Sequence, residues 1–100
     1  MAEYKIIIYK TAQNDVKDII DYLNTLSEQA ALKYYDLLVE KIHSLSDMPQ
    51  RCPLSRDPQL KIRGYRSLLV ENYIVLYVIK DDVVQIRRIL YAHRQYEWML

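Results

Sequence analysis

The chain has 100 residues, 51% of them hydrophobic, and a formal net charge of +1. This length suits a single domain over residues 1–100 with a modest core, and the hydrophobic fraction argues against intrinsic disorder. The near-neutral charge is atypical of proteins that grip phosphates, although acidic residues gather in the first half of the chain and basic residues in the second. The single cysteine, Cys52, excludes an internal disulfide and fits a reducing compartment.

The amino terminus predicts neither export nor membrane insertion. The opening residues Met-Ala-Glu-Tyr-Lys lack the apolar core of a signal peptide. No apolar run approaches the ~20 residues that cross a bilayer. We therefore expect a soluble cytoplasmic protein with no membrane partner.

The first predicted elements are a strand and a helix. Residues 4–9 are β-branched or aromatic, which favours a strand covered on both faces or nearly so. Apolar residues at helical spacing then indicate an amphipathic helix over residues 12–25. Thr11 is the expected N-cap, and Asp15 is expected in the first turn, where a carboxylate complements the helix dipole.

A second helix is predicted directly after the first. Ser27 is its expected N-cap, and an apolar stripe runs from Ala31 to Leu45. Pro49 ends it, because the residue before a proline avoids the helical region. Since few residues separate the two helices, we expect an antiparallel helical hairpin.

The remainder predicts a loop and then a β-meander. Residues 49–62 hold all three prolines and are expected to be loop. Strands are expected over residues 65–70, 73–79 and 83–92. The middle strand is entirely apolar and is therefore expected to be central and buried on both faces. Glu71-Asn72 is expected to form one turn, since Asn tolerates positive φ, and Lys80-Asp81-Asp82 the other.

The predicted order is β-α-α-β-β-β. Tight turns make the last three strands an antiparallel meander, which the first strand must join, and the helical hairpin must cover one face of the sheet. The sequence therefore predicts an α+β two-layer domain.

Metal, cofactor and nucleophile chemistry find little support in the sequence. Cys52, His43 and His93 lack the spacing of metal ligands, so we expect no metal and no cofactor. No Gly-rich phosphate loop and no Ser or Cys nucleophile motif is present. Asp81 and Asp82 lie in a predicted turn, where solvation explains them better than acid–base chemistry.

The paired arginines of the last strand have a structural interpretation. Successive residues of a strand face opposite sides, so Arg87 and Arg88 are not expected to share a site. Arg88 is expected either to pair, partly buried, with a helix carboxylate or to lie at an edge. Tyr96 and Trp98 are interpreted first as packing groups.

Two segments carry a family resemblance. Residues 64–77 read GYRSLLVENYIVLY, and residues 88–96 read RILYAHRQY. A Tyr-Arg pair on one strand, a tyrosine-flanked apolar central strand and a last strand followed by His-Arg resemble the RelE/ParE superfamily of bacterial toxin–antitoxin toxins. The front half is similar too, so the resemblance covers nearly the whole chain. It implies a small antiparallel sheet with a helical hairpin against it, which is the order that periodicity predicts.

The resemblance implies two possible activities. RelE-like toxins are ribosome-dependent mRNA endonucleases, whereas ParE-like toxins block DNA gyrase and need no active site. For a nuclease, the resemblance places a phosphate-binding group at Arg94, an acid or base at His93, a basic group at Arg66 and a phenol at Tyr96. These side chains are expected on or near one exposed surface.

The nuclease pattern is incomplete, which favours the ParE-like activity. Ile74 stands where RelE-like nucleases carry an arginine, and Leu68 occupies a second basic position. An aliphatic side chain cannot stabilise a phosphorane, and an oriented donor is worth roughly 3–4 kcal/mol. We therefore expect a gyrase-directed toxin. The alternatives are a ribosome-dependent endoribonuclease and a non-toxic homologue that only binds its antitoxin.

A cognate antitoxin is the expected partner in every case. Such antitoxins lay an extended or helical segment over the toxin. We expect this contact in a groove beside the helical hairpin, near exposed tyrosines such as Tyr22 or Tyr35. The expected target is DNA gyrase, or the ribosome with its mRNA. The chain has no helix-turn-helix pattern, so we expect no direct operator-DNA binding.

Overall fold

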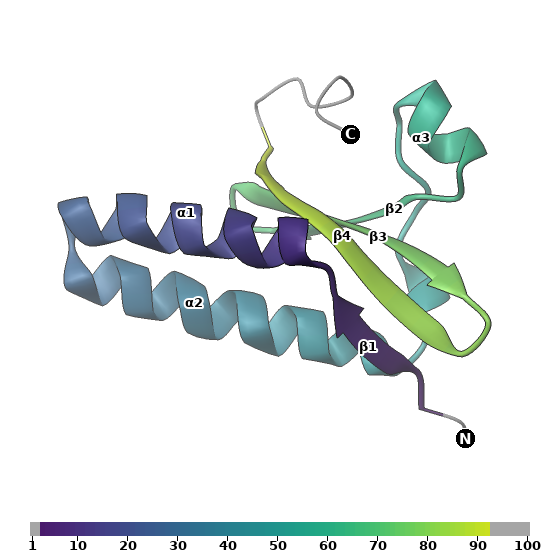
Figure 1. The fold of residues 1–100 in the computed structure, drawn as a ribbon, viewed down its shortest axis with the longest axis horizontal. Coiled ribbons are helices and arrows are strands. Elements are labelled where there is room, and N and C mark those ends of the chain that lie inside the picture. Colours follow the sequence, from purple (N-terminus) through teal and green to yellow (C-terminus); the bar gives the residue numbers. More distant parts are fainter. Residues whose placement is uncertain (1–2, 93–100) are drawn as a thin grey trace.

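The computed structural model describes residues 3–92, and in that range a helical hairpin packs on a twisted sheet (Figure 1). The elements in chain order are β1 (Lys5–Ile8), α1 (Lys10–Leu26), α2 (Glu28–His43), the 3₁₀ turns η1 (Ser44–Ser46) and η2 (Pro49–Arg51), α3 (Pro58–Ile62), β2 (Arg66–Val70), β3 (Tyr73–Lys80) and β4 (Val83–Tyr91). The sheet order is β1-β4-β3-β2, with β1 parallel to β4 and the other pairs antiparallel. The predicted α+β architecture is therefore confirmed.

The meander turns where the sequence predicts it to turn. The tight turns fall at residues 71–72 and 81–82. Within these two turns, the residues with positive φ are Glu71, at 53°, and Asp81, at 56°. Asn72 was expected to take the left-handed conformation in the first turn, and Glu71 takes it instead. The strand register fixed by the apolar β3 prevails over the side-chain preference of a single turn residue.

β1 differs from the expectation of a strand covered on both faces. Ile7 and Ile8 are 40% and 37% exposed. β1 lies at the edge of the sheet and pairs only with β4. An apolar run of this length fits an edge strand as well as a central one, and only the strand order decides between them.

The start of α1 also differs from the expectation. The helix begins at Lys10, and its N-cap, Tyr9, forms no side-chain capping bond. The Thr11 hydroxyl donates instead to the carbonyl oxygen of Arg87, at 2.9 Å. β1 pairs with β4 over only four residues, so the later residues of β4 need other partners for their backbone groups. Side chains of α1 provide them, and this tertiary contact takes precedence over local capping.

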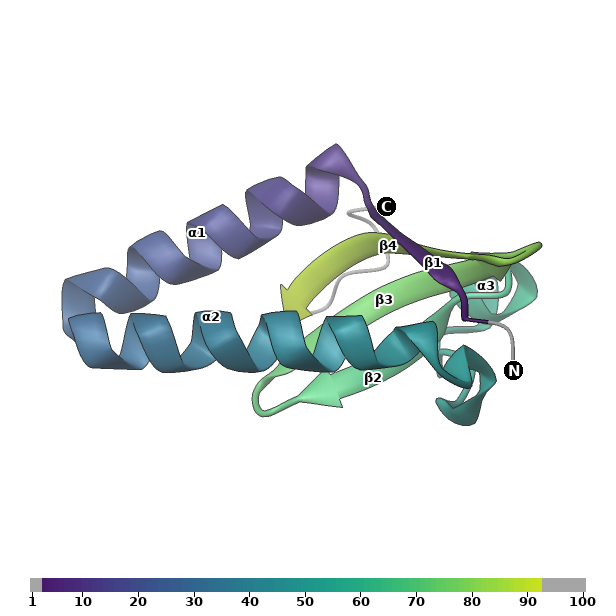
Figure 2. The ribbon, with the colours of Figure 1, turned by 90° about the horizontal axis from the view of Figure 1, so that it is seen from below.

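α2 begins as the sequence predicts. The Ser27 hydroxyl accepts a hydrogen bond from the backbone N–H of Ala30, at 3.2 Å, and Glu28 lies in the first turn. The connection from α1 is a single residue, so the helices form the expected antiparallel hairpin. They meet at the tip of the hairpin and separate toward β1, as Figure 2 shows.

The main core fills the space between the hairpin and the sheet. Its buried members are Ala12, Leu38, Ile42, Leu45, Cys52, Val70, Tyr73, Val75, Tyr77, Val84, Ile86 and Ile89. A smaller cluster on the opposite face joins Leu60, Tyr65, Leu76 and Leu90. β3 contributes buried residues to both clusters, which confirms its central position. Tyr77 is fully buried, and its hydroxyl donates to the carbonyl oxygen of Pro49, at 2.6 Å.

The segment expected to be loop, residues 49–62, contains η2 and the helix α3. Asp57 caps α3 by accepting hydrogen bonds from the backbone N–H groups of Gln59 and Leu60. Pro58 stands at its first position, where a missing N–H costs nothing. The proline-rich composition led to the prediction of a loop, although the sequence contains both the N-cap and the N-terminal proline of this helix.

Candidate functional site

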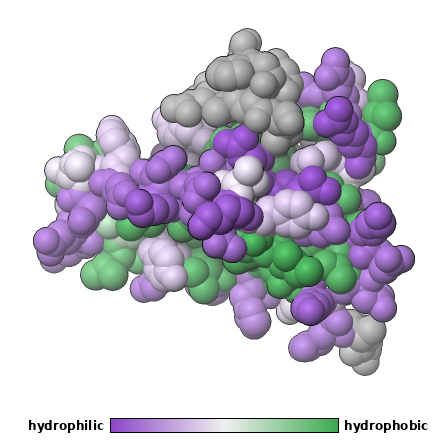
Figure 3. Space-filling view, in the orientation of Figure 1, coloured by the Kyte–Doolittle hydropathy of each residue, from purple (hydrophilic) through white to green (hydrophobic). Residues whose placement is uncertain are grey.

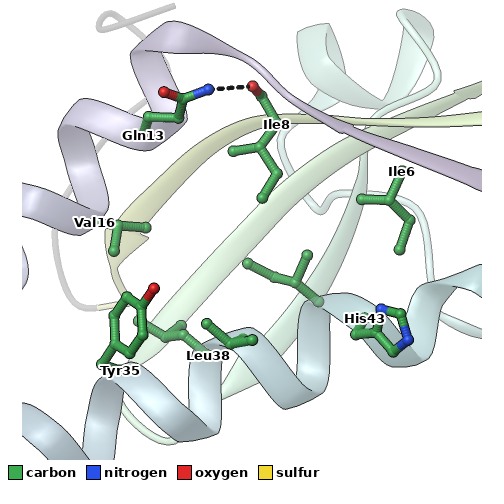
Figure 4. A pocket seen from close by; sticks show the side chains of 9 residues that line it. Ile6, Ile8, Gln13, Val16, Tyr35, Leu38 and His43 are labelled. Carbon is green, nitrogen blue, oxygen red and sulfur yellow. Dashed lines mark hydrogen bonds between the residues drawn. The ribbon is translucent and has the colours of Figure 1, made fainter.

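An apolar cavity of about 320 Å³ lies where β1, α1 and α2 meet (Figure 4). We call it the helix groove. It is lined by Ile6, Ile8, Gln13, Val16, Tyr35, Leu38, Val39, Ile42 and His43. The lining is mainly aliphatic, with polar groups from Gln13, Tyr35 and His43.

The groove exists because α1 and α2 separate where β1 enters the sheet. Alternation along β1 points Ile6 and Ile8 toward α2, as Figure 4 shows. The Gln13 amide donates to the carbonyl oxygen of Ile8, at 2.9 Å, and fixes the corner between β1 and α1. Such a lining suits apolar side chains of a peptide better than a charged small molecule.

The apolar surface continues along the hairpin. A second, more open depression is lined by Ile20, Asn24, Glu28, Ala31, Leu32 and Tyr35. Tyr35 borders both depressions, whereas Tyr22 is exposed but lines neither. Figure 3 shows this hydrophobic band running below the polar surface of α1. An amphipathic helix or extended segment could bury its apolar face here.

Arg66 is a predicted site residue with a defined set of contacts in the structure. It pairs across the strands with Tyr77, so its side chain leaves the sheet on the face that carries the helices. Its guanidinium donates to the carbonyl oxygens of Cys52, at 2.7 Å, and Gln50, at 3.3 Å. Arg66 therefore holds the loop after η2 against the sheet.

The other predicted site residues, His93, Arg94 and Tyr96, lie outside the described residues, as does Trp98. The two aliphatic replacements fall on different faces. Ile74 packs against the smaller cluster, opposite the helices. Leu68 packs against the main core under the helices, so its side chain serves the fold. Neither position supplies a basic side chain, and the two do not share a face of the sheet.

Arg88 forms the ion pair with a helix carboxylate that was one of its two expected roles. Its Nε lies 2.7 Å from Oδ2 of Asp15, and its Nη2 lies 3.0 Å from Oδ1. Both side chains are largely buried, at 16% and 13% exposed. The same carboxylate accepts the backbone N–H of Ile89, at 2.9 Å. The hydrogen bond to Asp15 raises the pKa of Arg88.

Asp15 therefore acts differently from the prediction. It does not lie in the first turn of α1 and closes the free edge of β4 instead. A carboxylate that binds both a guanidinium and a strand N–H fixes α1 to the sheet at this point. The local dipole argument could not reveal this partner, which lies more than seventy residues away in the chain.

A β-bulge in the last strand lies at the two adjacent arginines, Arg87 and Arg88. The register of β3 and β4 shifts between Leu76 and Tyr77, so the strict alternation assumed for the last strand is wrong here. Ile86 belongs to the main core and Leu90 to the smaller cluster. Arg87 stacks on the ring of Tyr9, with 4.5 Å to the centroid. The expectation that the two arginines face opposite sides is wrong, because Arg88 pairs with Leu76 and Arg87 also lies over the ring of Tyr65, at 5.9 Å, and both of these neighbours belong to the smaller cluster. Arg87 and Arg88 still have different closest partners, Tyr9 and Asp15.

Two further observations concern the described part of the chain. Residues 3–92 contain no cluster of three or more His, Cys, Asp or Glu side chains arranged to hold a metal ion. In the same range, no helix is long and apolar enough to cross a membrane.

The architecture defines the class of protein. The fold, a helical hairpin on a sheet of order β1-β4-β3-β2, is similar to that of chains from two toxin–antitoxin systems. A chain of the chromosomal ParDE toxin–antitoxin system from P. aeruginosa superposes with a TM-score of 0.78 at 23% identity, over 91% of this chain and 98% of that one. A chain of the RelBE2 toxin–antitoxin complex from Mycobacterium tuberculosis gives 0.60 at 26%, over 90% and 99%.

The sequence match narrows the class to one family. The family described as the ParE toxin of the type II toxin-antitoxin system, parDE, matches residues 6–96. The chain therefore belongs to the ParE toxin family. A search among curated proteins found no match.

Proposed function

We propose that this ParE-family toxin arrests bacterial growth by binding and inhibiting DNA gyrase. The observation that carries the proposal is the match to the ParE toxin family over residues 6–96. Gyrase is the target that the resemblance of the sequence implies for ParE-like members. Inhibition by binding needs a shaped surface and no catalytic group.

The contacts of Arg66 and Arg88 support inhibition by binding. Arg66 is engaged with the carbonyl oxygens of Gln50 and Cys52. Arg88 is engaged with Asp15. Ile74 adds an aliphatic side chain to the face opposite the helices. A ribonuclease needs cations free to receive a phosphorane, and these positions serve the fold instead.

A supercoiling assay tests the target. Purified chain is added at micromolar concentration to gyrase, ATP and relaxed plasmid, and we expect supercoiling to be lost. Relaxation of the supercoiled form of the same plasmid by a type I topoisomerase serves as the control for unspecific effects on DNA. Normal supercoiling at every concentration would contradict the proposal.

The ribonuclease alternative has its own measurement. Stalled ribosomes carrying mRNA are incubated with the chain, and cut sites are mapped. Cleavage that disappears in Arg94→Ala, with gyrase unaffected, would replace the proposed target and assign a role to Arg94. Alanine variants of the other members of the set, Arg66, His93 and Tyr96, would then be tested in the same way. If growth, gyrase and mRNA are all unaffected, the chain is a non-toxic homologue that binds its antitoxin.

We further propose that a cognate antitoxin lays an apolar segment in the helix groove, in the cytoplasm, and that this chain does not itself bind operator DNA. The two similar structures belong to a ParDE toxin–antitoxin system and a RelBE2 toxin–antitoxin complex. Val39→Asp places a charge at the half-exposed rim of the groove. We expect weaker antitoxin binding by calorimetry. Gln29→Asp, an exposed position of α2 outside the groove, is the matched control.

A further inference from the structure

We propose that α3 and its flanking residues form a preformed docking element for an acidic protein surface with an apolar pocket, carried by the target of the toxin. We call this element the basic knob and define it by Arg56, Lys61, Ile62 and Arg63. The inference rests on the proposed function, because it takes gyrase as that target. It assigns the contact to a part of the chain distinct from the helix groove.

The first observation is that α3 is closed at both ends. Oδ1 of Asp57 accepts from the backbone N–H groups of Gln59, at 2.9 Å, and Leu60, at 3.0 Å. At the other end, Gly64 has φ +82°, a left-handed conformation that glycine adopts without strain. Its N–H donates to the carbonyl oxygen of Lys61, and the N–H of Tyr65 donates to that of Leu60, both at 3.0 Å. This pair of bonds is the Schellman arrangement.

The second observation is that α3 is anchored to the sheet. Leu60 and Tyr65 are buried and pack with Leu76 and Leu90 on the face opposite the helical hairpin. The N–H of the buried Ser55 donates to the carbonyl oxygen of Tyr65, at 2.8 Å. A five-residue helix cannot persist by itself, so these contacts hold its outer side chains in place.

The third observation is what the anchored helix presents. Ile62 is 86% exposed, more than any other large hydrophobic side chain among residues 3–92. Arg56, Lys61 and Arg63 surround it in the sequence and are all exposed. Between residues 56 and 66 the one acid is Asp57, whose carboxylate is engaged in the cap. The knob thus combines local positive charge with an isolated apolar side chain.

The charge selects an acidic partner, and Ile62 selects a protein over a nucleic acid. A phosphate backbone would be gripped by the cations alone, with aromatic groups for the bases. An aliphatic side chain at the centre of a cationic rim matches a protein interface in which one apolar anchor fills a pocket and charges steer the encounter. The fixed backbone reduces the entropy lost on binding.

The position of the knob separates it from the helix groove. No residue of the knob lines the groove. Figure 1 shows α3 near the end of the sheet farthest from the tip of the hairpin. Variants of the knob should therefore leave antitoxin binding intact, and this readout reports whether they are folded.

The experiment measures binding to purified gyrase without DNA, inhibition of supercoiling, and antitoxin affinity. The test variants are Lys61→Glu combined with Arg63→Glu, and separately Ile62→Ala. The matched control, Lys33→Glu with Lys41→Glu, makes the same charge change on exposed positions of α2. We expect each test variant to raise the half-inhibitory concentration roughly tenfold or more, as for a residue central to an interface. Antitoxin affinity should stay within about twofold, and the control should inhibit like the original chain.

Each alternative outcome decides something different. If the original chain inhibits gyrase and the knob variants inhibit equally, the docking role is overturned and the proposed function stands. If the charge reversal weakens inhibition and Ile62→Ala does not, the contact is purely electrostatic and the apolar pocket is wrong. If the original chain leaves gyrase unaffected, the proposed function fails and the assignment of the knob fails with it.

Discussion

The two faces of the sheet are covered in different ways. The face under the helical hairpin carries the main core, which runs from α1 and α2 to every strand of the meander. The opposite face has a small cluster held by α3 and the segment around Tyr65. The helix-covered face supports the stability of the domain. The opposite face holds the short helix α3, which buries few residues of its own. The helix face thus sets the fold, and the other face is where a basic, locally anchored surface is displayed.

The largest expected effect tests this difference directly. Leu38→Ala removes a fully buried side chain from the main core and should lower the free energy of unfolding by about 3 kcal/mol. Leu60→Ala, equally buried in the smaller cluster, should cost less, because α3 can open locally while the rest stays folded. Urea denaturation measures both. Equal losses would show that the two clusters form one cooperative core.

The next effect concerns the contact that joins α1 to the sheet. Asp15→Ala leaves Arg88 without this carboxylate and the N–H of Ile89 without its acceptor, so we expect a loss of about 2 kcal/mol. Asp18→Ala, on the exposed side of the same helix, should change stability by less than about 0.5 kcal/mol. The same denaturation experiment reads both variants. If Asp15→Ala lowers the free energy of unfolding no more than Asp18→Ala does, the Asp15 contact does not contribute to the stability of the domain.

A smaller effect is expected at alkaline pH. Burial raises the pKa of Tyr77 well above its ordinary value of 10.0, with a further rise from the neighbouring Cys52. The pKa of Tyr77 is higher in the folded state than in the unfolded state. The contribution of Tyr77 to stability is therefore fully present below pH 10, and it is lost as the pH rises from 10 toward the folded-state pKa. Each pH unit above 10 should lower the free energy of unfolding by up to about 1.4 kcal/mol.

Tyr77→Phe should flatten this dependence, although it also loses the hydrogen bond to Pro49, worth about 1 kcal/mol. Stability is measured between pH 9 and pH 11 for both chains. Parallel curves would mean that Tyr77 does not titrate differently in the folded and unfolded states.

The smallest effect is confined to α3. Nothing lies within 4 Å of a Cβ added at Gly64, so Gly64→Ala probes its left-handed backbone alone. We expect a cost of about 1 kcal/mol and hydrogen exchange in α3 that is roughly fivefold faster. Asn tolerates this conformation, so Gly64→Asn should cost less. Unchanged exchange in α3 would show that the glycine is not needed to close the helix.

The sequence predicted most of the helix-covered face. Apolar periodicity located α2, and the unbroken apolar run of residues 73–79 identified the central strand. It could not reveal that β1 lies at an edge, or that Thr11 and Asp15 bind β4, because such contacts depend on segments far apart in the chain. The bulge beside Arg87 was equally hidden, since it changes the side-chain alternation without a sequence signal.

The opposite face was predicted less well, although signals for α3 were present. Asp57 followed by Pro58 is a readable helix start, and the single glycine of the chain, Gly64, is a readable stop. The segment was nevertheless predicted to be a loop, because it holds all three prolines of the chain. For the groove, Tyr35 does line the predicted region and Tyr22 does not. Whether Arg66 shares a surface with His93 and Arg94 stays a prediction, since those two lie outside the described residues.

Hydrogen exchange on two complexes tests the central claim most directly. The chain is bound to gyrase in one sample and to its antitoxin in the other, and the slowed amides are mapped along the chain. We predict that gyrase slows exchange in residues 55–65, around α3, and that the antitoxin slows exchange in β1 and α2. Protection of β1 and α2 by gyrase, with residues 55–65 unchanged, would contradict the division of the molecule into two binding regions.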